Sequence, residues 1–247
     1  MQTAKNNIIE QLQKEILCLQ GFKPLPAGKN ISFGLEAMER SFPQGVFPLA
    51  AVHEFISTSL ETSAATSGFV AGLISSLMQL TGGTCVWISV SGRIFPPALK
   101  IFGIEPERII FINLKNEKEM CWVMEEALKC NGLAAVVCEM QHLSFTASRR
   151  LQLAVEQSRV TGFVLRNQKA NTNTTACVSR WKITPAKSVF DGDLAVVGFP
   201  RWQVELLKIR NGRPGAWQVE WASGRFRPVL HPVVIPSLQK PLQRKTG

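Results

Sequence analysis

The stretch HEFISTSLETSAATSGFVAGL, from His53 to Leu73, decides the expected fold. It begins with an apolar run, continues through residues rich in Ser and Thr, and ends in the pattern of an apolar helix. A buried strand that leads through a turn into a helix is how a nucleotide-binding P-loop domain begins. The sequence therefore predicts an α/β domain and raises the question of whether this turn binds a nucleotide.

The predicted turn lacks the residues that hold a triphosphate. A P-loop of the form G-x-x-x-x-G-K-[ST] directs backbone N–H groups and a lysine at phosphate, and a hydroxyl at magnesium. Between Glu54 and Gly68 the chain has no Lys, Arg or Gly, and Glu61 adds negative charge that opposes a nucleotide. We expect a degenerate P-loop without cofactor or metal, at Ser57, Thr58, Ser59, Leu60, Glu61, Thr62 and Ser63.

The chain around this element alternates apolar runs with helical patterns. The predicted strands are residues 46–55, 85–90, 108–113, 133–140 and 161–166. The middle three are almost entirely apolar, which is typical of strands buried on both faces of a parallel sheet. The predicted helices are residues 67–80, 96–103, 117–132, with Gly132 as a stop, and 146–158. This order predicts an open, mostly parallel sheet with helices on both faces.

A different pattern begins after about residue 170. Residues 179–183, 200–209 and 216–221 alternate as half-buried strands do, and the connection RNGRPGA carries hairpin signals. The alternation places Trp202 with Val204 and Leu206 on one face, so we predict that these tryptophans belong mainly to the core. An antiparallel extension on one edge of the parallel sheet is the simplest assembly.

The predicted organisation has three parts. An amphipathic helix over 6–19 and a linker occupy residues 1–29, the main domain 30–227 contains a core (46–166) and a β extension (175–222), and residues 228–247 form a Pro-rich basic tail. The chain has no long apolar run and no apolar leader, so we expect a cytoplasmic protein that does not contact a membrane. Its six cysteines show no Cys-x-x-Cys spacing and are predicted to be reduced core residues.

Charge is distributed unevenly along the chain. Residues 1–140 hold 11 Lys/Arg and 13 Asp/Glu, whereas residues 141–247 hold 17 Lys/Arg and 5 Asp/Glu, and the whole chain has a net charge of +10. A basic half of this size favours encounter with nucleic acid or an acidic partner. The alternative, a solvated basic surface without a partner, stays open.

No catalytic constellation is apparent in the sequence. The three histidines, His53, His142 and His231, do not combine with a nucleophile and an acid in a recognisable pattern. Glu139, which follows an apolar run, resembles a metal-holding acid, but a single carboxylate at a strand end is more often structural. We therefore expect a protein that is not an enzyme.

Several segments together resemble the ImuA family, RecA-like and SulA-like accessory proteins of bacterial mutagenesis cassettes. The resemblance covers roughly residues 30–222, and its most specific pieces are TASRRLQLA and PRWQVELLKIRNGRPGAWQVEW. It implies a RecA-like core and a role in the SOS response, in damage-induced, error-prone translesion synthesis. The partners that it implies are ImuB, a Y-family polymerase homologue, and an error-prone replicative-type polymerase, with RecA and DNA as further candidates.

Contact surfaces are the remaining route to function if nucleotide chemistry is absent. Candidate residues for DNA or partner binding are Arg149, Arg150, Arg159, Lys208, Arg210 and Arg213. Cations near a helix N-terminus are electrostatically unfavourable, so Arg149 and Arg150 are expected to meet phosphate or carboxylate groups. Their structural alternative is packing over the sheet or pairing with Glu125, Glu126 or Glu156.

Three hypotheses follow from the sequence. The leading hypothesis is a non-enzymatic adaptor in a translesion synthesis complex. The alternatives are a weak, atypical RecA-like ATPase and a SulA-like inhibitor of cell division. The basic second half and the long β extension favour the adaptor.

Overall fold

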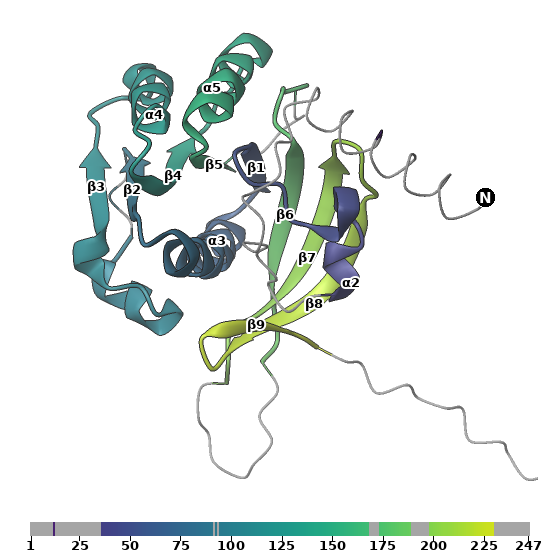
Figure 1. The fold of residues 1–247 in the computed structure, drawn as a ribbon. Coiled ribbons are helices and arrows are strands. Elements are labelled where there is room, and N and C mark those ends of the chain that lie inside the picture. Colours follow the sequence, from purple (N-terminus) through teal and green to yellow (C-terminus); the bar gives the residue numbers. More distant parts are fainter. Residues whose placement is uncertain are drawn as a thin grey trace, which may run out of the picture.

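A single mixed sheet organises the chain (Figure 1). The computed structural model describes residues 12, 36–90, 92, 94–167, 173–188 and 198–229. Its nine strands lie in the order β3-β2-β4-β5-β1-β6-β7-β8-β9. The strands from β3 to β6 are parallel, and β7, β8 and β9 continue the sheet in antiparallel fashion. The predicted α/β class, with a parallel core and an antiparallel extension, is confirmed.

The parallel part contains strands that are buried on both faces. Its strands are β1 (Val52–Ser57), β2 (Thr84–Ser89), β3 (Ile109–Asn113), β4 (Leu133–Met140), β5 (Thr161–Asn167) and β6 (Ser179–Ala186). All six residues of β1, which lies between β5 and β6, are buried. Apolar side chains on both faces make a strand suitable for the middle of an α/β sheet.

Helices cover both faces of the sheet. One face carries α3 (Leu60–Thr81), the 3-10 helix η2 (Pro96–Phe102) and the short α2 (Glu36–Glu39). The other face carries α4 (Met120–Leu128) and α5 (Phe145–Ser158), which pack against Val52, Val136 and Val164. Short 3-10 turns complete the connections: η1 (Pro43–Gly45), η3 (Pro106–Arg108) and η4 (Glu117–Glu119).

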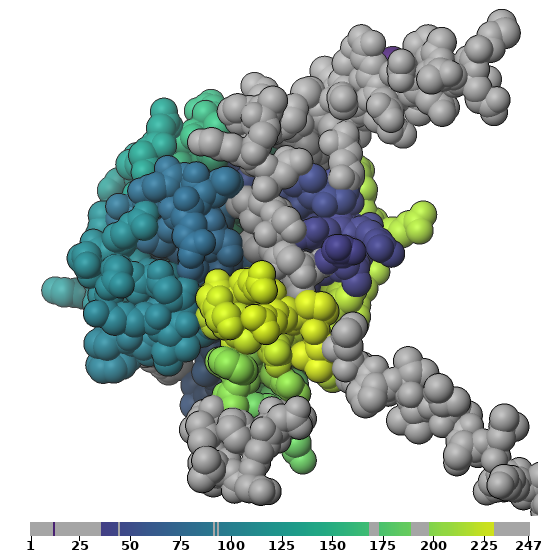
Figure 2. All heavy atoms as spheres, turned by 60° about the horizontal axis from the view of Figure 1, so that its bottom comes forward, coloured from purple at the N-terminus to yellow at the C-terminus, as the bar shows by residue number. Residues whose placement is uncertain are grey.

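The β extension closes the aromatic core on the α3 face. It consists of β7 (Arg201–Ile209), β8 (Gly215–Ala222) and β9 (Arg225–Pro228), and Figure 2 shows its last hairpin in yellow against the teal part of the chain. The ring of Trp221 lies 5.7 Å from that of Phe102, and its indole N–H donates to the Ile101 carbonyl. A Cβ at Gly72 would lie 2.6 Å from the Phe226 ring, so only glycine allows this hairpin to pack closely on α3.

The tryptophan prediction is confirmed for the extension. Trp181, Trp202 and Trp221 are buried in the core, whereas Trp217 is only partly buried against it. The alternation of the strands therefore identified the inward face correctly.

Several predicted boundaries are wrong. Helix α3 begins at Leu60 and not near residue 67, because Ser59 caps it and Thr62 reinforces the cap. Strand β1 begins only at Val52, because Ala50 has a φ of 51° that interrupts the extended run. Helix α4 ends at Leu128, so Gly132 is not its stop. Residues 96–102 form a 3-10 helix, and the short strand β9 was not predicted.

Other predictions concern the ends and the cysteines. The predicted helix over 6–19 and the tail beyond residue 229 lie outside the described residues, apart from Leu12. Cys85, Cys138 and Cys177 are buried free thiols, as predicted, but Cys130 is exposed. Helix α3 is long and apolar enough to cross a membrane, yet most of its apolar window is buried inside the protein.

Hydrogen bonds fix the tautomer of His53 in β1, and burial keeps its ring neutral. Its Nε2 lies 2.7 Å from the Pro48 carbonyl, which can only accept, so this nitrogen carries the proton. Its Nδ1 lies 2.6 Å from the Ser179 hydroxyl, to which the Trp181 indole N–H also donates. Burial lowers the pKa of His53 from 6.5 to about 4, partly offset by the bond to Pro48. The folded protein therefore contains a neutral His53 at neutral pH.

Stability should fall as the pH drops from 6.5 to 4. Because the folded-state pKa of His53 is below its unfolded value, the unfolded chain binds the proton first, and the free energy of unfolding declines by up to about 3 kcal/mol. Urea unfolding at a series of pH values measures this. A His53→Gln protein should be less stable at pH 7 but show a smaller decline in this window. The matched control is His142→Gln, at an exposed position, and equal slopes in all three proteins would contradict the assignment.

Candidate functional site

The connection from β1 to α3 is much shorter than its composition suggested. Only Thr58 and Ser59 separate Ser57, the last residue of β1, from Leu60, the first residue of α3. Leu60, Glu61, Thr62 and Ser63 form the first turn of the helix. The predicted degenerate P-loop position is therefore a two-residue turn followed by helix, with no extended loop to surround a phosphate.

The backbone donors of this turn are bound by the turn's own side chains. The hydroxyl oxygen of Thr62 accepts from the N–H groups of Thr58 (3.1 Å) and Ser59 (2.9 Å). In return the Thr62 N–H donates to the Ser59 hydroxyl oxygen at 3.2 Å, which completes a capping box. The N–H groups of Thr58, Ser59 and Thr62, at the position where a P-loop binds phosphate, are thus bound within the protein, and Glu61 stands beside them.

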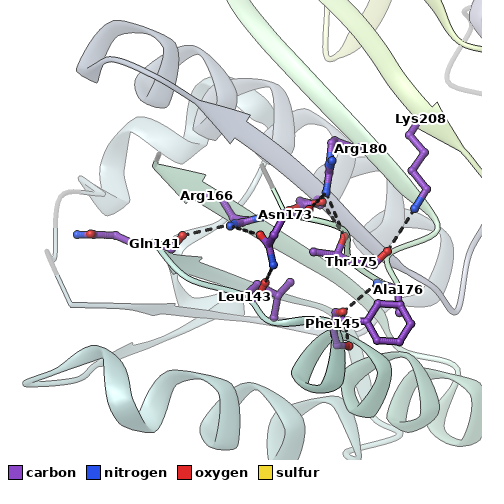
Figure 3. Close-up of polar contacts among 11 residues, drawn as sticks. Gln141, Leu143, Phe145, Arg166, Asn173, Thr175, Ala176, Arg180 and Lys208 are labelled. Atoms are coloured by element: carbon purple, nitrogen blue, oxygen red, sulfur yellow. Dashed lines mark hydrogen bonds and ion pairs between the residues drawn. The ribbon is translucent and has the colours of Figure 1, made fainter. Parts of the chain in front are cut away.

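A buried cluster of charges lies on β1 itself and on its two neighbours, β5 and β6 (Figure 3). Glu54 of β1 is fully buried and pairs with Arg166 of β5, whose side chain is 1% exposed. The second oxygen of Glu54 accepts from Arg180 of β6 at 2.8 Å and from the Thr175 hydroxyl at 2.9 Å. One carboxylate therefore holds two arginines from two different strands. Ions removed from water remain stable only when they are paired and hydrogen-bonded in this way.

The cluster also fixes the connection between β5 and β6. We call residues 173–178, which precede β6, the strap. Arg166 donates to the Asn173 side-chain oxygen at 3.0 Å, and Arg180 donates to the Asn173 carbonyl at 2.7 Å. The Asn173 amide in turn donates to the Leu143 carbonyl at 2.8 Å. The arginines thus hold an extended segment against the sheet on the face covered by α5.

The strap is also held from both sides. Its Ala176 N–H donates to the Ser148 hydroxyl of α5 at 2.9 Å. Lys208 of β7 donates to the Thr175 carbonyl at 3.2 Å, and Arg210, the residue after β7, donates to the Ala176 carbonyl at 3.1 Å. The structure therefore brings Lys208 and Arg210, two of the predicted contact residues, to the same segment as α5.

The remaining predicted contact residues are dispersed. Arg150 pairs with Glu125 of α4, so the structural alternative holds for this residue. Arg159 caps the far end of α5 in a left-handed conformation with a φ of 69°. Arg213 is exposed in the β7–β8 turn, where its N–H binds the Ser41 carbonyl near α2. Arg149 is exposed beside Ser148 on α5.

The sequence alone did not predict that three residues of the buried cluster form a site. Glu54, Arg166 and Arg180 are not among the predicted site residues, but all three are held in one network. A signal was present: a charged residue within an apolar, doubly buried strand requires a partner of opposite charge. The spacing along the chain could not show which partner, because the contacts join residues 112 and 126 positions apart.

Other candidates for chemistry have structural roles. Glu139 accepts from the Trp87 indole N–H at 2.7 Å. Burial raises the pKa of the Cys177 thiol to about 12, which opposes formation of a thiolate. Within the described ranges, no group of three or more His, Cys, Asp or Glu is placed to hold a metal ion.

The sheet order, the strand–turn–helix of β1 and α3, and helices on both faces define an α/β protein of the RecA-like class. ImuA proteins of two Caulobacter vibrioides strains, NA1000/CB15N and ATCC 19089/CIP 103742/CB 15, are each 37% identical to this chain over 198 residues. The matched region covers 76% of this chain and 81% of each relative. No family model matches the chain. The chain belongs to the ImuA family, and this supports an ImuA-type role in the mutagenic response to DNA damage.

Replacement of Glu54 by Gln should destabilise the protein strongly. It leaves the Arg166 and Arg180 side chains buried without a carboxylate, at a cost of about 3–5 kcal/mol in the free energy of unfolding. Glu205→Gln is the matched control, because it removes a partly exposed pair with Lys182 and should cost about 0–1 kcal/mol. Denaturant unfolding of both variants measures the difference, and equal small costs would show that the cluster does not hold the strap.

Proposed function

We propose that this protein is a non-catalytic, RecA-like adaptor of damage-induced, error-prone DNA synthesis. In this proposal it works in the cytoplasm, in a complex with an ImuB-like Y-family polymerase homologue and an error-prone replicative-type polymerase. RecA and DNA are further candidate partners. The protein contributes binding surfaces to the complex and neither binds nor hydrolyses ATP.

One observation carries the proposal: the turn between β1 and α3 is closed by the hydroxyl of Thr62. RecA-like ATPases need backbone N–H groups that are free to meet phosphate, together with a lysine. Here the N–H groups of Thr58 and Ser59 are bound to Thr62, and no basic residue lies between Glu54 and Gly68. In this proposal a RecA-like scaffold with this turn acts only by binding other molecules at its surface.

Two separate surfaces make an adaptor role physically reasonable. Strand β3 lies at one edge of the sheet. Two large apolar side chains in this part of the protein, Ile110 of β3 and Trp122 of α4, are more than half exposed. Exposed aromatic side chains are enriched in protein interfaces. On the same face of the sheet but toward β6 and β7, cations gather around the strap. One chain can therefore present an apolar contact and a basic contact at different places.

A pull-down of the full chain against the purified ImuB-like homologue and the polymerase tests the adaptor role. We expect direct retention of the ImuB-like protein, and retention should survive nuclease treatment because the contact is between proteins. Loss of retention after nuclease, or no retention of either partner, would contradict the proposal. Filamentous growth on overexpression, with unchanged mutagenesis after deletion, would instead favour the SulA-like alternative.

A further inference from the structure

The strap lies between two elements that both carry basic side chains. Helix α5 reaches it through Ser148, and β7 reaches it through Lys208 (Figure 3). Arg210, the residue after β7, also donates to the strap. Beneath these contacts, Arg180 of β6 binds Asn173 and Thr175 of the strap. We call Arg149, Arg180, Lys208 and Arg210 the strap cluster.

Arg149 belongs to this group because of its place on α5. Successive residues of a helix are rotated by about 100°. Ser148 faces the strap and Arg150 faces α4, where it pairs with Glu125. Arg149 lies between these two directions, about 100° from each, on the exposed side of the helix. The acid of α5 nearest to this side, Glu156, is two turns away and accepts from Gln152.

The strap cluster has an excess of positive charge. Glu54 is a single carboxylate against the two guanidinium groups of Arg166 and Arg180. Lys208 and Arg210 donate to carbonyl oxygens of the strap, which do not neutralise them. None of the ion pairs formed by the described residues includes Arg149, Lys208 or Arg210. Lysine has three donors and arginine five, so both side chains retain donors for an anion.

An exposed aromatic ring lies at the same place. Phe145, the first residue of α5, is 54% exposed, and Figure 3 shows its ring beside Ala176. Its carbonyl accepts from the Ser148 hydroxyl, the group that also binds the Ala176 N–H. An exposed apolar ring on the helix that binds the strap contributes nothing to binding of free phosphate or of a duplex backbone alone. It suits a ligand that combines regularly spaced phosphates with flat, exposed bases.

We propose that the strap cluster and Phe145 bind single-stranded DNA. Lys208, Arg210 and Arg149 contact successive phosphates, and the Phe145 ring stacks against a base. The inference rests on the proposed function in one respect, since a role in DNA damage is the reason to prefer DNA to another single-stranded polyanion. It does not require the protein partners to bind at this surface.

Fluorescence anisotropy with a labelled oligo-dT tests the site. The wild-type chain should bind, and the logarithm of its association constant should fall linearly with the logarithm of salt concentration. In K208Q/R210Q, affinity should fall at least about tenfold and the salt slope should shrink by about 1.4, or about 0.7 for each lost contact. Phe145→Ala should weaken binding about fivefold or more at every salt concentration.

Matched controls separate the site from general charge. K115Q/K118Q makes the same charge change at two exposed lysines between β3 and α4, and Trp122→Ala removes an exposed ring from α4. Both should retain wild-type binding of DNA. Circular dichroism and urea unfolding establish that every variant is folded. K208Q/R210Q should also still retain the ImuB-like partner after nuclease treatment.

Several results would overturn the inference. The first is that the wild-type chain does not bind DNA at low salt. The second is that K208Q/R210Q and K115Q/K118Q lose DNA affinity equally, and the third is that Phe145→Ala leaves DNA affinity unchanged. Equal displacement of the DNA by poly-glutamate would identify an acidic protein segment as the ligand and would also overturn it. Each of these results can occur while the ImuB-like partner is retained, so the adaptor role and the DNA site fail separately.

Discussion

The hydroxyl of Thr62 binds the N–H groups of Thr58 and Ser59, and this contact sets the start of α3. A helix N-terminus has backbone donors that must find partners. In a nucleotide-binding protein the phosphate accepts hydrogen bonds from some of these donors. Here the Ser59 and Thr62 side chains accept them from each other's backbone N–H groups. The element most typical of a RecA-like ATPase is therefore stable without ligand. The residues that satisfy the helix thus bind the backbone donors that a triphosphate would need.

The second constraint is the pairing of Glu54 with Arg166 and Arg180. Parallel strands are usually joined by a helix that crosses the sheet, but the described end of the β5–β6 connection, the strap, contains neither helix nor strand. The buried Arg166, the partly buried Arg180 and Glu54 hold this segment in position. The arrangement places β6 beside β1, and β7 can then add to β6 in antiparallel fashion. Glu54, Arg166 and Arg180 thus position the strap and, with one carboxylate against two guanidinium groups, also leave one positive charge unbalanced.

The parallel core could be predicted because its signal is local. The strands β2 and β4 are nearly continuous apolar runs, and the alternation of β7 identifies Trp202 as a core residue. The start of α3 was missed because Ser and Thr favour turns as well as helix caps. The spacing from Ser59 to Thr62 was the sign of a cap, but Thr62 takes the place where a Glu or Gln is expected.

The candidate site was predicted less completely because it depends on tertiary contacts. Arg149 and Arg150 are neighbours in sequence, yet only Arg150 finds a carboxylate, since Glu125 of the adjacent helix faces it. Lys208 and Arg210 were predicted as contact residues, and the fold brings them to the strap. Arg213 and Arg159 have the same chemistry but lie on other parts of the surface, because the turn and the helix end direct them elsewhere. Charge could be read from the sequence, whereas the grouping of charges required the fold.

Calorimetric titration of the purified full chain with magnesium ATP tests the central claim most directly, with a RecA-type ATPase as the positive control. A turn whose N–H groups are already bound, and which has no lysine, predicts no binding up to millimolar nucleotide. Magnesium-dependent binding in the micromolar range would contradict the account, because it would show that the capping box opens to admit a triphosphate.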